Sequence, residues 1–245
     1  MPVGGASAGD RGRDLRGEAA QARARRVETG KRGSAGQSET AKNRQAKAWS
    51  AGAKGEERTA FRLDGLRAHG VTTLHDRLLQ PDKAWNLDHL VVAPAGVFFV
   101  DAKNWRGRLS VYRGTLWRHW YAGSVAGRQS ASMQAEVNKV AGMSAKASQR
   151  LGVTGVVVQG VIALAGAQSK DLTEVLEVGG VRVVSVHALS SWIRDQPAVV
   201  DRAQVAMLVS IAERVFPPAV VADTGEVVRQ REWDAAMGRV PRPKD

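Results

Sequence analysis

Two apolar segments separated by three residues constrain the fold of this 245-residue chain more than any other feature. Residues 86–93 (NLDHLVVA) and 97–105 (VFFVDAKNW) have the length and the apolar content of β-strands. Pro94, Ala95 and Gly96, which lie between them, are typical of a tight turn. We therefore predict two antiparallel strands at the centre of a β-sheet.

Charged residues interrupt these strands at positions that strand geometry brings together. Successive side chains point to opposite faces, so Asp88 shares a face with Leu90. Asp101 and Lys103 likewise share a face with Phe99. A short turn between the strands places position 88 near position 101. The pattern predicts two carboxylates and one ammonium group that converge on one face of the sheet.

Paired carboxylates repel one another, and a divalent cation is the common way to relieve that repulsion. Magnesium takes one or two carboxylates together with waters and a phosphate oxygen. Lys103 would then position or activate the attacking water, or neutralise the charge that grows on the phosphate. Asp-x-Lys alone is a weak signal, because surface strands often alternate charges. The apolar run before Asp101 strengthens it, because strand ends are favoured places for sites.

Helices and further strands are expected around this hairpin. Residues 54–69 predict a helix whose broad apolar face carries Ala60, Phe61, Leu63 and Leu66, with Gly70 as its stop. The remaining elements are expected as a strand over 71–79, a hairpin over 109–112 and 115–121, a helix over 133–151, strands within 153–166 and 181–189, and helices over 190–195 and 199–216. This order predicts an α/β fold with a mixed sheet flanked by helices.

Positive charge points to a polyanionic partner. The chain has 36 Lys and Arg against 24 Asp and Glu, a net charge of +12, so its surface should attract nucleic acid. Residues 1–50 hold 11 basic and 5 acidic residues but few aliphatic ones, and we expect a disordered basic arm. It either contacts phosphates or is simply a soluble tail. Residues 51–216 should form the folded domain, and residues 217–245 a polar C-terminal tail.

No segment approaches the ~20 apolar residues of a membrane-spanning helix. The first residues are polar and lack the apolar middle region of a secretory signal. The chain contains no cysteine, which excludes disulfides and thiolate metal sites. We expect a cytoplasmic protein without a membrane partner; the alternative, a membrane-surface or protein-interaction element, rests on the basic arm alone.

Three parts of the sequence resemble the nuclease-related domain (NERD) family: GAKGEERTA at 52–60, the block from Asn86 to Leu109, and the later helix that carries Gln134. The resemblance covers roughly residues 52–186. It implies a restriction-endonuclease-like fold with the αβββαβ core of the PD-(D/E)XK nucleases. It also implies a metal-dependent nuclease that uses Mg²⁺, or Mn²⁺ in its place, with DNA favoured over RNA. The alternative is a nucleic-acid-binding module that has lost catalysis, and a homodimer is left open.

The resemblance assigns the metal ligands. Asp88 would be the lone aspartate of the second strand, and Asp101 and Lys103 would form the D/E-x-K element. The family's helix glutamate, in Gly-x-x-Gly-Glu, corresponds to Glu56, which would hold a water beside the metal. Helical geometry alone does not choose between Glu56 and its neighbour Glu57. The expected metal ligands are therefore Asp88, Asp101 and Glu56.

Other residues carry two interpretations each. Gln134 loosely matches a helix glutamine that PD-(D/E)XK nucleases place near the phosphate, and a solvated helix position is the equal alternative. His89 should face away from Asp88 and make a structural hydrogen bond rather than act as a base. Trp105 should pack rather than stack on a base.

The hairpin over 109–121 combines aromatic and basic residues, namely Trp117, Trp120, Tyr121, Arg113 and Arg118. It is either a surface that tracks a nucleic-acid backbone or a hairpin packed on the core, and the packed reading is slightly favoured.

Overall fold

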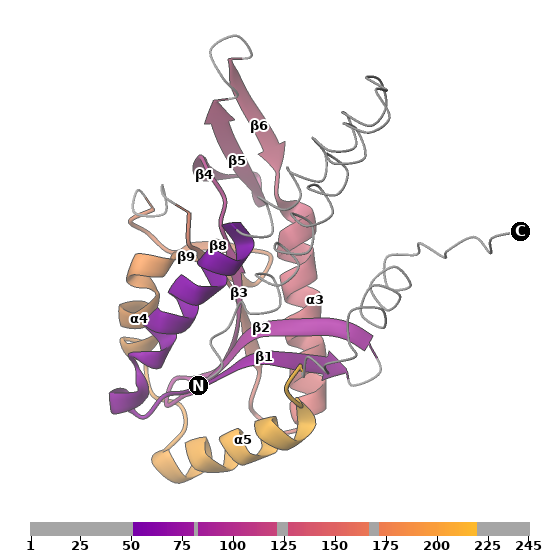
Figure 1. The fold of residues 1–245 in the computed structure, drawn as a ribbon, viewed down its shortest axis with the longest axis vertical. Helices are drawn as coiled ribbons and strands as arrows, with labels where there is room; N and C mark the ends of the chain where they lie inside the picture. Colours follow the sequence, from indigo (N-terminus) through magenta and orange to yellow (C-terminus); the bar gives the residue numbers. More distant parts are fainter. Residues whose placement is uncertain (1–50, 81–82, 122–126, 167–171, 220–245) are drawn as a thin grey trace, which may run out of the picture.

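The structure is a computed structural model that describes residues 51–80, 83–121, 127–166 and 172–219. The expected basic arm lies outside these residues, as does residue 220 onward of the expected tail. The main strands are β1 (Thr72–Gln80), β2 (Lys83–Ala93), β3 (Gly96–Lys103), β7 (Val158–Leu164), β8 (Leu176–Val178) and β9 (Val181–Ser185). They form one six-stranded sheet in the order β1-β2-β3-β7-β9-β8 (Figure 1).

Strand directions make this sheet mixed. Strands β1, β2 and β3 are antiparallel neighbours, whereas β3 pairs with β7, and β7 with β9, in parallel. The short edge strand β8 pairs antiparallel with β9. The opposite edge is extended by residues beyond the last helix, because Leu78 N donates to Pro217 O at 2.9 Å. The central antiparallel pair β2–β3 is the hairpin that the sequence predicts.

A second, three-stranded antiparallel sheet is inserted between β3 and the next helix. Its strands are β4 (Arg108–Tyr112), β5 (Thr115–Tyr121) and β6 (Arg128–Ser132), in the order β4-β5-β6. Figure 1 shows this small sheet projecting beyond one end of the main sheet. The sequence predicts β4 and β5 but not β6, whose five residues, RQSAS, have little β-propensity.

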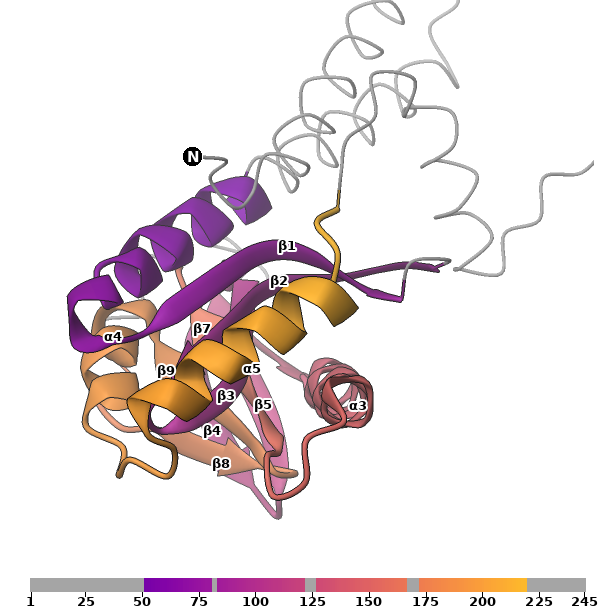
Figure 2. The same cartoon turned by 90° about the horizontal axis from the view of Figure 1, so that it is seen from below.

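Helices cover both faces of the main sheet. The described helices are one over residues 51–64, the 3₁₀ turn η1 (Arg67–His69), α3 (Gln134–Leu151), α4 (Val186–Arg194) and α5 (Arg202–Val215). Apolar residues of α3 and α5 pack on one face. The helix over 51–64 and α4 pack on the other, as Figure 2 shows for α3 and α4. Helix, β1, β2, β3, α3 and β7 follow one another in the expected αβββαβ order.

The core face of the first helix is narrower than predicted. Ala60 and Leu63 are buried, but Phe61 is 76% exposed, so its placement on the core face was wrong. Each residue turns an α-helix by about 100°, which moves Phe61 well away from the direction shared by Ala60 and Leu63. The helix instead buries Ala53 and Thr59 with them.

Two predicted strands are shorter than their apolar runs. The run over 181–189 was expected as a strand, but the strand ends at Ser185, whose Oγ accepts from His187 N and caps α4. The run over 153–166 becomes a strand only at Val158, and Val157 is 74% exposed. Gly155, with φ of 80°, turns the chain before it. Local capping and turn residues therefore make both strands shorter than their β-branched content predicts.

A histidine pair, of which His89 is buried and His75 partly buried, links β1 and β2. His89 is fully buried, and its Nδ1 lies 2.8 Å from His75 Nδ1. His75 Nε2 lies 3.0 Å from Asp64 Oδ1. The expected structural hydrogen bond of His89 is thus present. Burial, and then the neighbouring His75, lower the pKa of His89 to about 3.

This lowered pKa predicts an acid-dependent loss of stability. Between about pH 6.5 and pH 3 the unfolded chain binds a proton at His89 that the folded chain does not. Stability therefore rises with pH in this window and falls on acidification, by up to about 1.4 kcal/mol per pH unit. We expect His89→Gln to flatten the dependence in urea unfolding between pH 4 and 7. His69→Gln, at an exposed histidine, is the control. Equal slopes in wild type and His89→Gln would contradict the prediction.

Candidate active site

The register of β2 and β3 sets two carboxylates opposite one another. The paired residues run from Ala93↔Gly96 to His89↔Val100, and the next positions in this register are Asp88 and Asp101. At that point a side chain continues the pairing, because Ala102 N donates to Asp88 Oδ2 at 3.0 Å. Burial, and then the carboxylates of Asp101 and Glu56, raise the pKa of Asp88 well above its usual range.

Asp101 is a buried carboxylate held by two lysines. Its side chain is 2% exposed, and Lys103 Nζ lies 2.8 Å from its Oδ2. Lys139 Nζ lies 3.6 Å from its Oδ1, and Glu136 Oε2 lies 3.3 Å from Lys103 Nζ. Lys139 and Glu136 are both on α3. The helix that follows the small sheet thus completes an ion-pair network around the Asp-x-Lys element.

The sequence did not identify Glu136 and Lys139 as part of this cluster. The two residues are spaced i, i+3 and flank the buried Val137 and Val140. Charged residues at such positions usually form a solvated helix face. Only the packing of α3 against β3 and β7 shows that this face reaches Asp101.

Lys103 is held in its charged form. Burial alone would lower the pKa of Lys103, but the carboxylates of Asp101, Asp88 and Glu136 outweigh it and raise the pKa above its usual range. At neutral pH the side chain is therefore an ammonium group. It can neutralise negative charge but cannot accept a proton from water.

Close packing at Gly55 carries Glu56 to this cluster. A Cβ at Gly55 would lie 3.3 Å from Asn104 Cβ and 3.4 Å from Ala165 Cβ. Asn104 Nδ2 also donates to Ala51 O at 2.7 Å. The first helix is therefore fastened to the residues that directly follow β3 and β7. Glu56, next to Gly55, comes close enough to raise the pKa of Asp88.

The two neighbouring helix glutamates have different surroundings. Glu56 is partly buried beside Asp88, whereas Glu57 is exposed to solvent. The structure thus places Glu56, rather than Glu57, with Asp88, Asp101 and Lys103. Spacing within the helix did not decide between them, but the family motif favoured Glu56.

Gln134 lies at the start of α3, and the contacts of its side chain are with groups other than the carboxylates. Its Nε2 donates to Asn138 Oδ1 at 3.0 Å, and it lies near the β8–β9 turn, 3.8 Å from where a Cβ of Gly179 would stand. In residues 51–219, apart from the undescribed gaps, no contact joins it to the carboxylates. Its proximity to a phosphate stays a prediction. Trp105, by contrast, packs against the main core as expected.

Two carboxylates, those of Asp88 and Asp101, are arranged to fit a metal ion, whereas a set of three is not found in the part of the chain that the structure describes. Among the described residues, no group of three or more His, Cys, Asp or Glu side chains is arranged to hold a metal ion. Asp88 and Asp101 nevertheless offer hard oxygen donors side by side. Burial first, and then repulsion from Asp101 and Glu56, raise the pKa of Asp88, and a bound cation would relieve that repulsion. This donor pair suits Mg²⁺, which needs one or two carboxylates and fills its other positions with water.

The comparison with known families agrees with this geometry. Residues 51–165 match the family model of the nuclease-related domain, NERD. This part of the chain is therefore similar to the nuclease-related domain. The NERD match runs from the first helix to the residue after β7, so it includes Glu56, Asp88, Asp101 and Lys103. The fold of the chain is compatible with the restriction-endonuclease-like architecture. Comparisons with curated proteins and with solved structures returned no match.

None of the described helices has both the length and the apolar character needed to cross a membrane.

The packing of the first helix predicts that substitutions of its two glycines, Gly52 and Gly55, differ in their effect on stability. A Cβ at Gly52 meets nothing within 4 Å, in contrast to Gly55. Gly55→Val should overpack the contact with Asn104 and lower the free energy of unfolding by about 1–3 kcal/mol. Gly52→Val, with the same change in helix propensity, is the matched control and should leave stability nearly unchanged. Urea unfolding of both variants measures the difference, and equal losses would contradict the close approach.

Proposed function

We propose that this domain hydrolyses phosphodiester bonds in DNA with the help of a divalent cation. One observation carries the proposal: the buried Asp101 is paired with Lys103 and stands opposite Asp88, next to the last paired residues of β2 and β3. The match to the nuclease-related domain supports the same class of activity. The chain's net charge of +12 favours a polyanionic substrate.

Asp88 and Asp101 would hold Mg²⁺, for which Mn²⁺ can substitute. A bound cation would stabilise negative charge on the phosphoryl oxygens as a Lewis acid. The backbone N–H of Ala102 keeps one Asp88 oxygen in place. Ion pairs with Lys103 and Lys139 hold the Asp101 carboxylate in place.

Lys103 acts as a fixed positive charge in this proposal. Its ammonium group is clamped between Asp101 and Glu136, so it stays charged and oriented before a substrate arrives. Preorganised charge of this kind stabilises the transition state without reorganisation during the reaction. Glu56, on the approaching helix, is the carboxylate best placed to orient the attacking water and to accept its proton.

A second candidate function is nucleic-acid binding without cleavage. One observation favours it: Asp101 is already paired with Lys103 and Lys139, and among the described residues no group of three or more His, Cys, Asp or Glu side chains is arranged to hold a metal ion. Cleavage assays separate the two candidates, because both predict binding.

Substitutions at the cluster should abolish cleavage of a labelled duplex in Mg²⁺. We expect Asp101→Asn and Lys103→Ala to lower the rate by about 10²-fold or more, since each removes a preorganised charge. Lys103→Ala leaves Asp101 buried beside Lys139 alone, so its melting temperature is measured alongside. Glu56→Gln should lose most activity, whereas Glu57→Gln, at the exposed neighbour, is the matched control and should lose little. Cleavage that survives in Asp101→Asn, or in chelator, would favour the binding module.

Metal binding also has a readout that does not depend on catalysis. Mg²⁺ at about 100 times its Kd should stabilise the wild-type fold by about 2.7 kcal/mol. Thermal unfolding at constant ionic strength measures this shift. Asp101→Asn should lose the shift, and Glu57→Gln should keep it. An equal Mg²⁺ shift in wild type and Asp101→Asn would place the cation elsewhere.

A further inference from the structure

One face of the small β4–β6 sheet gathers basic and aromatic side chains. Directly opposite residues in antiparallel strands point to the same face. The register pairs Arg108 with His119 and His119 with Ser130, and it pairs Tyr121 with Arg128. Positions 119 and 121 of β5 are two residues apart, so all five side chains share this face.

The opposite face of the same sheet is the packed one. Leu116 is fully buried in the main core, and Arg118, two residues along, lies over the ring of Trp120 at 4.3 Å. The packed interpretation of this hairpin is thus confirmed for the face that carries Leu116, and the nucleic-acid interpretation stays a prediction for the other face. Leu116 packs on the core, while Tyr121, which is 78% exposed, faces solvent.

The strands of the small sheet carry no negative charge of their own. The sequence contains no Asp or Glu between Asp101 and Glu136, a stretch that includes all three strands of the small sheet. Arg106, Arg108 and Arg128 form no salt bridge with any other described residue. Their charge is therefore free to act on an external anion.

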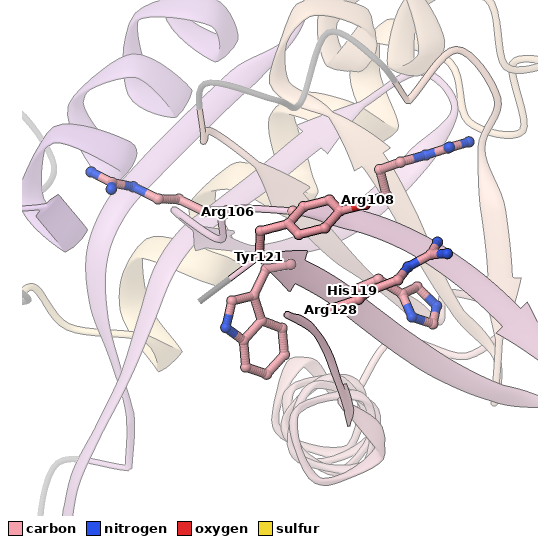
Figure 3. A pocket seen from close by; sticks show the side chains of 7 residues that line it. Arg106, Arg108, His119, Tyr121 and Arg128 are labelled. Carbon is pink, nitrogen blue, oxygen red and sulfur yellow. The ribbon is translucent and has the colours of Figure 1, made fainter. Parts of the chain in front are cut away.

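These groups line a hollow of about 670 Å³. Arg108, His119, Tyr121 and Arg128 line it from this face, Arg106 lines it from the preceding loop, and Trp120, whose position in β5 belongs to the opposite face, also contributes. Figure 3 draws Tyr121 between Arg106 and Arg108. Gly107 allows the chain to pass this closely, because with φ of 106° its Cβ would stand 2.2 Å from His119 O. The close approach of the Gly107 backbone to the His119 backbone therefore shapes this hollow together with the surface side chains.

His119 gives the floor of this hollow a fixed ring. Its Nε2 lies 2.8 Å from Ser110 Oγ, and its Nδ1 lies 2.7 Å from Ser130 Oγ. One hydroxyl from each neighbouring strand therefore holds the ring at both nitrogens. A ring held in this way loses little entropy when it meets a ligand.

We propose that this face binds a single-stranded segment of DNA next to the catalytic cluster. The three arginines would contact phosphates, and Tyr121 would stack on an unpaired base. A duplex hides the faces of its bases, so it could use the arginines but not the exposed tyrosine. The inference deepens the proposed function by naming the substrate class, and it rests on that function for what happens to the bound strand.

The chain connects this face directly to the carboxylates. Strand β4 begins five residues after Lys103, and α3, which carries Glu136 and Lys139, begins two residues after β6. Met133 N donates to Leu116 O at 2.8 Å and fastens that junction to the sheet. The small sheet is therefore joined by a short segment at each end to the elements that carry the Asp-x-Lys network.

Binding in chelator tests this inference without any cleavage. Fluorescence anisotropy of a labelled oligothymidine and of a matched duplex would be measured against salt concentration. We expect the wild type to bind the single strand more tightly. Tyr121→Ala should weaken single-strand binding by about 5- to 150-fold and leave duplex binding unchanged. Arg128→Gln should weaken both and reduce the single-strand salt slope by about 0.7.

An adjacent pair on the first helix provides the control. Phe61 is 76% exposed and Arg62 is also exposed, so Phe61→Ala with Arg62→Gln removes the same kinds of groups from another surface. This double variant should bind like the wild type, whereas Tyr121→Ala with Arg128→Gln should not. Melting temperatures confirm that both variants fold.

Two outcomes would overturn the inference: unchanged single-strand binding by Tyr121→Ala, or equal losses for single strand and duplex. Tyr121-dependent binding by a wild type that cleaves nothing in Mg²⁺ would overturn the proposed function and support the face. A wild type that cleaves DNA in Mg²⁺, but whose single-strand binding does not depend on Tyr121, would overturn the binding face and support the proposed function.

Discussion

The burial of one carboxylate, Asp101, is the constraint on which the rest of the site depends. A carboxylate that is 2% exposed must be compensated, because its desolvation costs several kcal/mol. Lys103 supplies the nearest compensation from the same strand, and Lys139 supplies the second from α3. The position of α3 against β3 is therefore linked electrostatically to the charge state of the site. Removal of either lysine changes both the fold's stability and the charge available to a phosphate.

Close approaches of glycines join the separate elements into one site. Gly55 lets the first helix touch Asn104, which follows β3. Gly166, after β7, packs on the carbonyl of Trp105, whose oxygen would lie 2.0 Å from a Cβ at that position. Gly107 lets the next residues pass over His119. The short loop between β3 and β4 is thus held from three sides, which fixes Lys103 on one side of it and the small sheet on the other.

Sequence reasoning succeeded where a period of two and a short turn determine the outcome. Parity and the turn at Pro94–Gly96 sufficed to place Asp88 opposite Asp101, because register in a short hairpin leaves no freedom. It failed where tertiary packing decides: the first helix's apolar face included Phe61, although the sheet covers only part of that face. Glu136 and Lys139 could not be found either, since i, i+3 charges look the same on a solvated helix as beside a buried carboxylate.

The small sheet shows how an insertion can add recognition without disturbing the core. Its Leu116 side is buried in the main core, so the sheet's position is fixed by the hydrophobic effect. Its other side is then free to carry Tyr121, Arg108 and Arg128, and these arginines form no salt bridge within the part of the chain that the structure describes. Binding energy from such a face acts away from the reacting bond, and it can be used to hold a strand against charges already fixed in place. In the proposed interaction the cluster around Asp101 remains small, because the contacts that would select the substrate belong to the neighbouring sheet.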